Sequence, residues 1–127
     1  MSSTAGLVKQ EAASEALEPR LKVWVEKEGQ LVLSDYRVRL LEAIAAKGSL
    51  AEGAAAMGLS YRRAWGKVKE IEANLGMKLV ESTVGGPGGG GSHLTPAAER
   101  LLAQYNRFRR ALSELADREF ERSFSDA

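Results

Sequence analysis

A tight turn between two helical segments, AAAMGLS at Ala54–Ser60, constrains this fold more than any other stretch of the chain. Its alanines let two helices approach closely, and Gly58 supplies the backbone freedom that a sharp reversal requires. Apolar residues at helical spacing follow the turn as far as Leu75. The stretch therefore predicts either a helix-turn-helix or an ordinary corner of an all-helical domain.

Capping signals divide the surrounding region into three helices. Ser34 or Asp35 can cap the first helix, and Gly48 can end it. The capping-box pattern SLAE opens the second helix, while Ser60 caps the third, which ends at Gly76. From these signals we expect helices over Asp35–Lys47, Ser49–Met57 and Tyr61–Leu75.

Two short hairpins are expected, one on each side of the three helices. Apolar residues alternate with charged ones over residues 21–33 and surround a tight turn at Glu28 and Gly29. After the third helix, Lys78–Thr83 and Ser92–Leu94 are predicted strands on either side of a glycine-rich run. A hairpin this short needs a partner to be stable.

The last part of the chain predicts one long helix. Thr95 and Pro96 form a strong helix start, and nothing breaks the helical pattern before about Phe124. Such a helix would be about 40 Å long, more than a domain of this size needs. Its apolar seam consists of Ala98, Leu101, Leu102, Tyr105, Phe108, Leu112, Leu115 and Ala116.

A sustained apolar seam on a long helix suits a two-fold interface between two copies of the chain. The residues expected at this dimer interface are Tyr105, Phe108, Leu112 and Leu115. The alternative is that the seam packs back on its own domain, as we expect for its first two turns.

The order of the elements predicts a winged helix-turn-helix. The expected fold class is mainly α with small β elements, with an N-terminal β-hairpin and a long C-terminal dimerisation helix. We expect a mobile arm over residues 1–18, the DNA-binding winged helix-turn-helix over 19–95, and the dimerisation helix over 96–127.

The third predicted helix has an apolar face and a basic face. The apolar stripe, which must face the core, consists of Ala64, Val68, Ile71 and Leu75. Arg62, Gly66 and Lys69 lie opposite this stripe. Glycine costs roughly 1 kcal/mol relative to alanine in a helix interior, a cost that makes sense where another backbone comes close. The alternative is an ordinary solubilising face.

The first turn of the same helix carries Arg62 and Arg63, where acidic residues are normally favoured. A phosphate backbone would reverse that penalty, because helix N-termini and arginines both bind phosphate. The arginines would either read guanine edges or hold phosphates, whereas Lys67 and Lys69 are expected to contact phosphates. The candidate DNA contacts of this helix are Ser60, Tyr61, Arg62, Arg63, Gly66, Lys67 and Lys69.

Two aromatic residues of this helix have alternative roles. Tyr61 would either touch DNA or pack against the neighbouring helix. Trp65 lies at the margin of the apolar stripe, and we expect it in a structural role because an indole usually buries its area.

The glycine-rich run GGPGGGG fits a linker, a phosphate loop or the tip of a wing. Its composition is that of a linker. It lacks the Lys-Ser/Thr ending of a phosphate loop. Its place between two predicted strands favours the wing, where missing side chains let the backbone approach a sugar-phosphate edge. The candidate wing contacts are Gly85, Gly86, Gly88, Gly89, Gly90, Gly91, Ser92 and His93.

The residue types narrow the chemistry further. The 127 residues include no cysteine and one histidine, so we expect no disulfide, no metal site and no cofactor. No acid pair, and no serine with a base, suggests catalysis, so we expect no enzyme activity. The formal net charge is only +1, yet Tyr61–Lys69 carries four basic residues and no acid. No apolar run reaches the roughly 20 residues of a membrane span and no signal peptide is visible, which predicts a cytoplasmic protein.

Several of these residues together resemble a known family. The Gly48-Ser49 helix start, Ser60-Tyr61 followed by Ala64-Trp65, and the glycine run leading into Leu94-Thr95 resemble the DNA-binding domain of ModE-type, molybdate-responsive transcription regulators. That domain is itself similar to the winged helix of LysR-type regulators. The resemblance covers roughly residues 21–120 and implies a dimer on a palindromic operator in double-stranded DNA, with the third helix in the major groove.

Two departures from the family pattern matter. Molybdate-sensing members carry oxyanion-binding domains after this one, whereas this chain stops at Ala127. We therefore expect no molybdate-binding domain of its own, and any effector would be sensed by a separate protein. Pro87 stands within the wing where a basic residue would suit DNA better, which leaves Lys78, Ser82, Ser92 and His93 as the polar contributors.

The expected function is thus a dimeric, sequence-specific DNA-binding transcription regulator. The alternative is a winged-helix protein-interaction module that does not read DNA. The alternative predicts little salt-dependent DNA affinity and tolerance of Arg62→Ala with Arg63→Ala.

Overall fold

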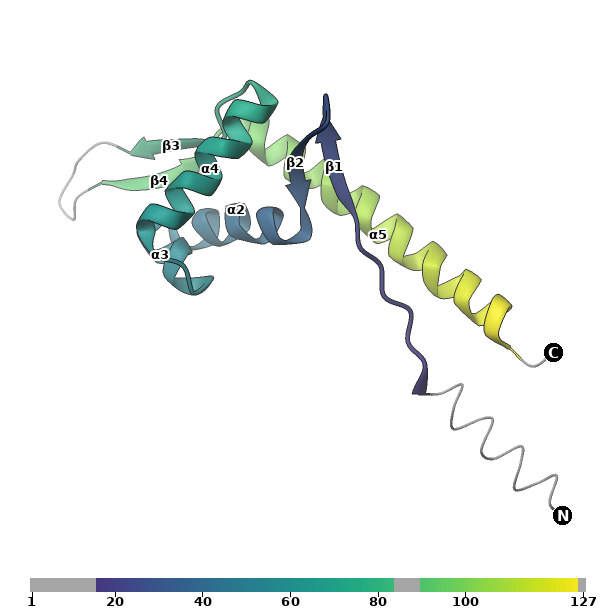
Figure 1. The fold of residues 1–127 in the computed structure, drawn as a ribbon. Coiled ribbons are helices and arrows are strands. Elements are labelled where there is room, and N and C mark those ends of the chain that lie inside the picture. Colours follow the sequence, from purple (N-terminus) through teal and green to yellow (C-terminus); the bar gives the residue numbers. More distant parts are fainter. Residues whose placement is uncertain (1–15, 84–89, 126–127) are drawn as a thin grey trace, which may run out of the picture. The chain divides into compact units, whose positions relative to one another are not determined.

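The computed structural model describes residues 16–83 and 90–125 of the chain (Figure 1). Most of the expected N-terminal arm and the glycines at 85, 86, 88 and 89 lie outside these residues. The elements are β1 (Trp24–Lys27), β2 (Gln30–Ser34), α2 (Asp35–Lys47), α3 (Leu50–Ala56), α4 (Tyr61–Leu75), β3 (Val80–Thr83), β4 (Gly91–Leu94) and α5 (Pro96–Phe124). The predicted fold class, a mainly helical winged helix-turn-helix with small β elements, is confirmed.

The chain forms two compact units. One unit is Val23–Asn106, and the other combines the described residues of Met1–Lys22 with those of Arg107–Ala127. Helix α5 begins in the first unit and ends in the second.

Local capping explains where the helices of the first unit begin. The hydroxyls of Ser34, Ser49 and Ser60 accept hydrogen bonds from backbone N–H groups three residues further on. Gly48 and Gly76 end α2 and α4 in the left-handed conformation. The bounds predicted for α2 and α4 are therefore confirmed.

The N-terminal hairpin is antiparallel, with its turn at Glu28 and Gly29, both of which have positive φ angles. Its second strand is tied to α4, because the Asn74 side-chain amide donates to the Leu31 carbonyl at 2.9 Å. The Lys27 ammonium donates to the Leu75 carbonyl at 3.0 Å. The hairpin therefore has the helical partner that its small size requires.

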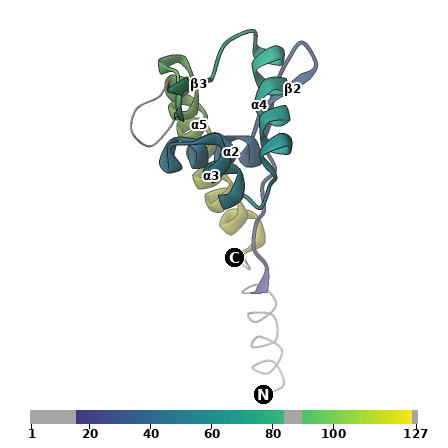
Figure 2. The same ribbon diagram turned by 90° about the vertical axis from the view of Figure 1, so that its left-hand side faces the viewer.

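Helix α2 is the centre of the first unit. It contacts β2, α3, α4 and β4, and Figure 2 shows it beside α3 in the middle of this unit. Side chains on more than one of its sides are therefore buried. This central position explains why Leu40 is buried as well as Val38, Leu41 and Ile44.

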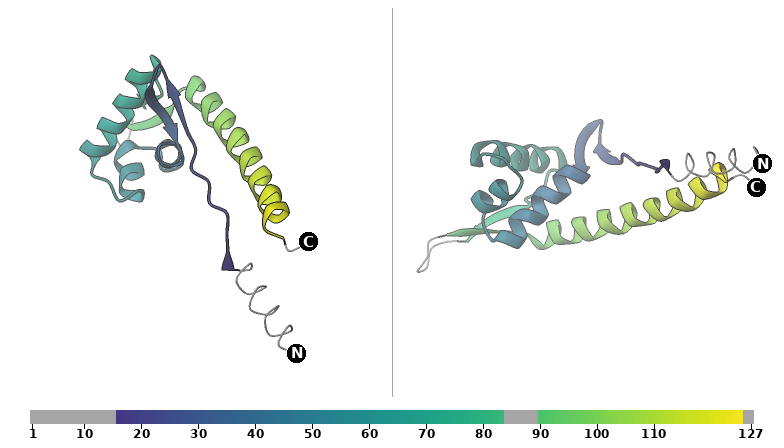
Figure 3. Two further views of the ribbon diagram at one scale, coloured as in Figure 1. Left: turned by 45° about the vertical axis from the view of Figure 1, so that its right-hand side comes forward. Right: turned by 90° about the horizontal axis from the view of Figure 1, so that it is seen from below.

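The core of this unit joins residues from all of these elements. Its largest fully buried side chains are Leu40, Leu41, Ile44, Ile71 and Leu79. The β3–β4 hairpin, called the wing below, lies near the end of α2 and leads directly into α5 (Figure 3). Its first strand begins at Val80, two residues later than predicted.

Tyr105 differs from its predicted role. Only 4% of its surface is exposed, and its hydroxyl donates to the Asp35 carboxylate within the first unit. Packing on the unit's own core thus extends one turn further along α5 than the first two turns expected. Tyr105 therefore has almost no surface to offer a second copy of the chain.

The second unit contains the end of α5 and the extended segment before β1. The Arg109 guanidinium donates to the Leu21 carbonyl at 2.9 Å and to the Ser113 hydroxyl at 2.7 Å. Phe108 and Leu115 are 48% and 46% exposed, respectively, and Leu112 is half-buried. This unit therefore presents large apolar side chains on its surface.

Candidate nucleic-acid interface

Helix α4 presents the two faces expected from its sequence. Ala64, Val68 and Ile71 are buried in the core. On the other side, Tyr61, Arg62, Arg63, Trp65 and Gly66 are all exposed. The fold thus turns a basic and aromatic surface outward.

The N-terminal end of α4 carries two arginines in its first turn. No acid lies in its first turn, where Arg62 and Arg63 stand. The Ser60 hydroxyl accepts from the Arg63 backbone N–H at 3.2 Å. This end therefore combines the positive pole of the helix with two exposed guanidinium groups, which favours an anionic partner.

Gly66 lies open in the middle of this surface. A Cβ placed on it would meet no atom within 4 Å, so packing inside the protein does not require a glycine here. An exposed glycine in a helix interior costs about 1 kcal/mol relative to alanine. The position therefore suits close approach by another molecule.

The two lysines of α4 have intramolecular partners that the sequence did not reveal. The Lys67 ammonium lies 5.4 Å from the centre of the Tyr36 ring. The Lys69 ammonium lies 5.6 Å from the centre of the Trp65 ring and 3.2 Å from a carboxylate oxygen of Glu72. Both lysines are thus held at the edge of the basic face instead of extending freely from it.

Trp65 is not buried as predicted. It is 47% exposed, and Tyr61 is 57% exposed. The expectation was wrong because the core stripe of α4 is already filled by small and branched side chains, which leaves the indole at its margin. Both rings line a hollow of about 100 Å³ between α4 and the wing, together with Leu50, Val68, Lys69, Lys78, Val80, Ser82 and Ser92.

The wing is an antiparallel hairpin in which Ser82 pairs with Ser92 and Glu81 with His93. The Ser92 backbone N–H donates to the Gly48 carbonyl at 2.8 Å, which ties the wing to the end of α2. The exposed His93 ring shares a hydrogen bond of 3.0 Å with the Thr83 hydroxyl. The base of the wing is thus fixed to the helical region.

The glycines at the base of the wing have different environments. A Cβ on Gly91 would lie 2.5 Å from the Gly48 carbonyl oxygen, so the fold itself requires a glycine there. Gly90 is exposed. Approach to DNA was the predicted reason for glycine in the wing. At Gly91 the fold gives a second reason, which is the close contact with Gly48.

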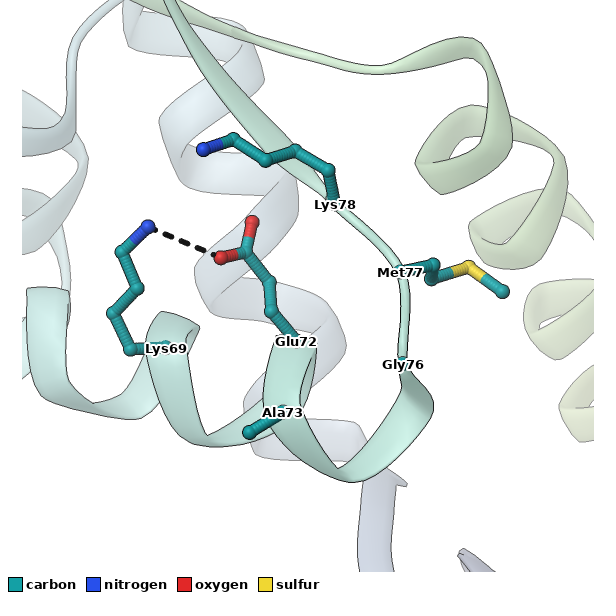
Figure 4. A pocket seen from close by; sticks show the side chains of 6 residues that line it. All are labelled: Lys69, Glu72, Ala73, Gly76, Met77 and Lys78. Carbon is teal, nitrogen blue, oxygen red and sulfur yellow. Dashed lines mark hydrogen bonds and ion pairs between the residues drawn. The ribbon is translucent and has the colours of Figure 1, made fainter.

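Glu72, which the sequence reasoning did not single out, connects α4 to the wing. One carboxylate oxygen accepts from the backbone N–H groups of Leu79 and Val80 at 2.8 and 3.1 Å. The other oxygen accepts from Lys69 (Figure 4). Burial raises the pKa of Glu72, but these hydrogen bonds and the Lys69 charge lower it by more, so the pKa lies below its ordinary value.

Among residues 16–83 and 90–125, no three acidic, histidine or cysteine side chains are grouped to hold a metal ion. No helix in the same ranges is long and apolar enough to cross a membrane.

Comparison with known proteins agrees with this architecture. Residues 36–99 match the family of bacterial regulatory helix-turn-helix proteins of the lysR type. The chain is 39% identical over 89 residues to the molybdenum-pterin-binding protein MopB of Rhodobacter capsulatus, covering 70% of this chain and 33% of MopB. It is 33% identical over 90 residues to the DNA-binding transcriptional dual regulator ModE of Escherichia coli, covering 71% and 34%. The chain thus spans about a third of the length of these relatives.

A solved structure supports the fold independently. The chain resembles CbnR_DBD in its complex with DNA, with a TM-score of 0.56 and 22% identity, over 72% of this chain and 99% of that one. The family model itself covers residues 36–99, which run from α2 through the wing to the start of α5. This chain therefore belongs to the lysR family of bacterial regulatory helix-turn-helix proteins and carries a winged helix-turn-helix of the DNA-binding, LysR- and ModE-like type.

Proposed function

We propose that this chain is a sequence-specific, dimeric transcription regulator that binds double-stranded DNA through α4 and the wing. One observation carries the proposal: the outward face of α4 combines two exposed arginines with an open glycine. The arginines favour binding of phosphates, and the glycine permits another backbone to come close. Both features lie on the helix that follows the turn of a helix-turn-helix, the usual position of a recognition helix.

In this proposal α4 enters the major groove. Arg62 and Arg63 contact guanine edges or phosphates, and Tyr61 and Ser60 lie beside them at the same end of the helix. Lys67 and Lys69, held at the margins of the helix, contact the phosphates on either side. Gly66 allows the helix to lie close to the DNA.

The hollow between α4 and the wing suits one sugar-phosphate unit of the DNA backbone. The rings of Tyr61 and Trp65 offer apolar surface to a deoxyribose, and the hydroxyls of Ser82 and Ser92 can donate to phosphate oxygens. Lys78 adds a positive charge to the same hollow. From there the wing, including Gly90–His93, would reach the neighbouring minor groove.

We propose that the second half of α5 forms the dimer interface, with Phe108, Leu112 and Leu115 at its centre. Large apolar side chains that remain exposed on a long helix are typical of a two-fold interface. In this proposal the dimerisation helix, residues 96–127, makes the interface through its second half, and residues 19–95 bind DNA. The double variant Leu112→Asp with Leu115→Asp should be monomeric by light scattering, and a dimeric variant would place the interface elsewhere.

The relatives suggest the biological setting. One is named as a regulator of transcription and another as a molybdenum-pterin-binding protein, so we propose molybdenum-related regulation in the bacterial cytoplasm. We also propose that any effector of this regulation is sensed by a separate protein.

The direct test is selection of bound sites from random duplex DNA with the purified chain at two salt concentrations. We expect an enriched palindrome whose half-sites lie about one helical turn apart. Affinity should fall steeply as salt rises, because several phosphate contacts release counterions. Recovery of no enriched sequence would reject the proposal and favour a protein-interaction module.

A further inference from the structure

Glu72 lies where an acidic side chain is least expected. It stands on the last turns of α4, three residues after Lys69, on the helix that we propose to face DNA. The side chains of Lys69 and Lys78 both extend along the same side of its carboxylate, whereas Met77 points away (Figure 4). A negative charge here repels the phosphates of DNA. Another contribution of Glu72 must therefore outweigh this repulsion if the helix binds DNA.

The contacts of the carboxylate indicate that role. Only 10% of the Glu72 side chain is exposed, and both of its oxygens accept hydrogen bonds. Two of the donors are the backbone N–H groups of Leu79 and Val80, at the point where the chain enters β3. A carboxylate bound to backbone donors makes stronger hydrogen bonds than a neutral group does.

The same entry segment is held from its other side by Thr95. The Thr95 backbone N–H donates to the Leu79 carbonyl, and its hydroxyl donates to the Lys78 carbonyl, both at 2.9 Å. The hydroxyl also accepts from the Ala98 N–H at 3.1 Å, at the start of α5. Glu72 is thus the side chain that ties this segment to α4, while Thr95 ties it to α5.

We infer that Glu72 is a positioning residue for DNA binding, which fixes the wing and Lys69 relative to α4 so that helix and wing reach one DNA duplex together. The inference rests on the proposed function. It assigns to an acidic residue a favourable effect on the binding of a polyanion. Electrostatic repulsion alone predicts the opposite, that Glu72 weakens DNA binding. The two predictions differ in direction, so measured affinities can distinguish them.

The first experiment measures duplex affinity, on the site recovered by selection, for the full chain and two variants. Glu72→Ala should bind on the order of tenfold more weakly, equivalent to about 1.4 kcal/mol, although it removes a negative charge. Glu70→Gln is the matched control, because it removes one negative charge from the same helix while its partner is Arg37 and not the wing. We expect the control to bind as tightly as the wild type or more tightly.

A conservative variant separates positioning from charge. Glu72→Gln keeps a carbonyl oxygen that can accept from Leu79 and Val80, so it should recover most of the affinity lost in Glu72→Ala. All affinities are measured well below the melting temperature of each variant, where a residue that only stabilises the fold would leave binding unchanged. If Glu72→Ala binds as tightly as the wild type or more tightly, the inference is wrong while the proposed function stands.

A measurement on the wild-type chain covers the case in which Glu72→Ala does not fold. The amide proton resonances of Leu79 and Val80 should shift together as acid protonates Glu72, with a midpoint below the ordinary carboxyl range. If the amide proton shifts of Leu79 and Val80 do not change as Glu72 is protonated, the inference is wrong. If the wild type binds no duplex at all, the proposed function fails, and the positioning role fails with it.

Discussion

Helices α3 and α4 each contain an interior glycine, and the two glycines have opposite explanations. A Cβ on Gly53 of α3 would lie 2.7 Å from the Ile44 Cα, so the close crossing of α2 and α3 requires its absence. A Cβ on Gly66 of α4 would meet nothing within 4 Å. The first glycine is thus accounted for by the fold, and the second is not.

The contrast separates the residues that the helix-turn-helix needs for folding from the residues that remain exposed for a partner. Helix α3 is packed inward, with Leu50, Gly53 and Ala54 buried. Helix α4 uses one stripe for the core and presents arginines, aromatic rings and an open glycine outward. Substitutions at matched positions should therefore affect stability on α3 and DNA binding on α4.

The largest effect on stability is expected from Gly53→Ala. The added methyl group would overlap the backbone of α2, which cannot move without separating the two helices. We expect a loss of about 3 kcal/mol in the free energy of unfolding, at the upper end of the range for overpacking. Urea denaturation followed by circular dichroism measures this loss. A variant as stable as the wild type would show that the two helices can separate there at little cost.

The largest effect on binding is expected from Arg62→Ala combined with Arg63→Ala. Each lost contact to a base or phosphate costs about 1–3 kcal/mol, so affinity should fall about a hundredfold or more. Fluorescence anisotropy with a labelled duplex gives the affinity, and the thermal melt should be almost unchanged. Arg107→Ala with Arg110→Ala removes the same charge from exposed positions of α5. If this control loses as much affinity, general charge and not α4 governs binding.

Gly91→Ala tests whether packing within the protein requires the glycine at the base of the wing. Because its Cβ would lie 2.5 Å from the Gly48 carbonyl oxygen, the strand must shift and weaken the nearby Ser92 hydrogen bond. We expect a loss of about 1–2 kcal/mol in stability. Alanine at the exposed Gly90 is the control and should leave the melting temperature unchanged. Equal melting temperatures for both variants would argue against the internal requirement.

A smaller effect is expected from acid. The pKa of Glu72 is lower in the folded protein than in the unfolded chain, so its contribution to stability is complete above the unfolded carboxyl pKa. That contribution is lost as the pH falls through the folded pKa. The stability of the wild type should therefore decline more steeply below pH of about 4 than that of Glu72→Gln. Parallel declines would show that the carboxylate makes no net contribution.

Short-range signals made much of the fold predictable. Ser34, Ser49 and Ser60 bind N–H groups only three residues away, and the glycines that end α2 and α4 act on their own helices. Such interactions can be predicted from a few neighbouring residues in the sequence. They were sufficient to locate the turn, the outward face of α4 and the start of α5.

The remaining features depend on partners that lie far apart in the chain. Tyr105 binds Asp35, 70 residues earlier, and this contact draws it from the expected dimer seam into the core. Lys67 lies against Tyr36, which is on a different helix. No local periodicity predicts either contact, because each depends on how the helices pack. Glu72 was missed for another reason: an acid at the end of a helix looks like ordinary surface until its backbone donors are seen.

The central claim is that the outward face of α4 is kept open for DNA, and Gly66→Ala tests it most directly. Alanine should stabilise the fold by up to about 1 kcal/mol, because the helix gains propensity and nothing obstructs the methyl group. The same methyl group should weaken binding to the selected duplex, so stability and affinity should change in opposite directions. A variant that is more stable and binds DNA as tightly as the wild type would contradict the claim.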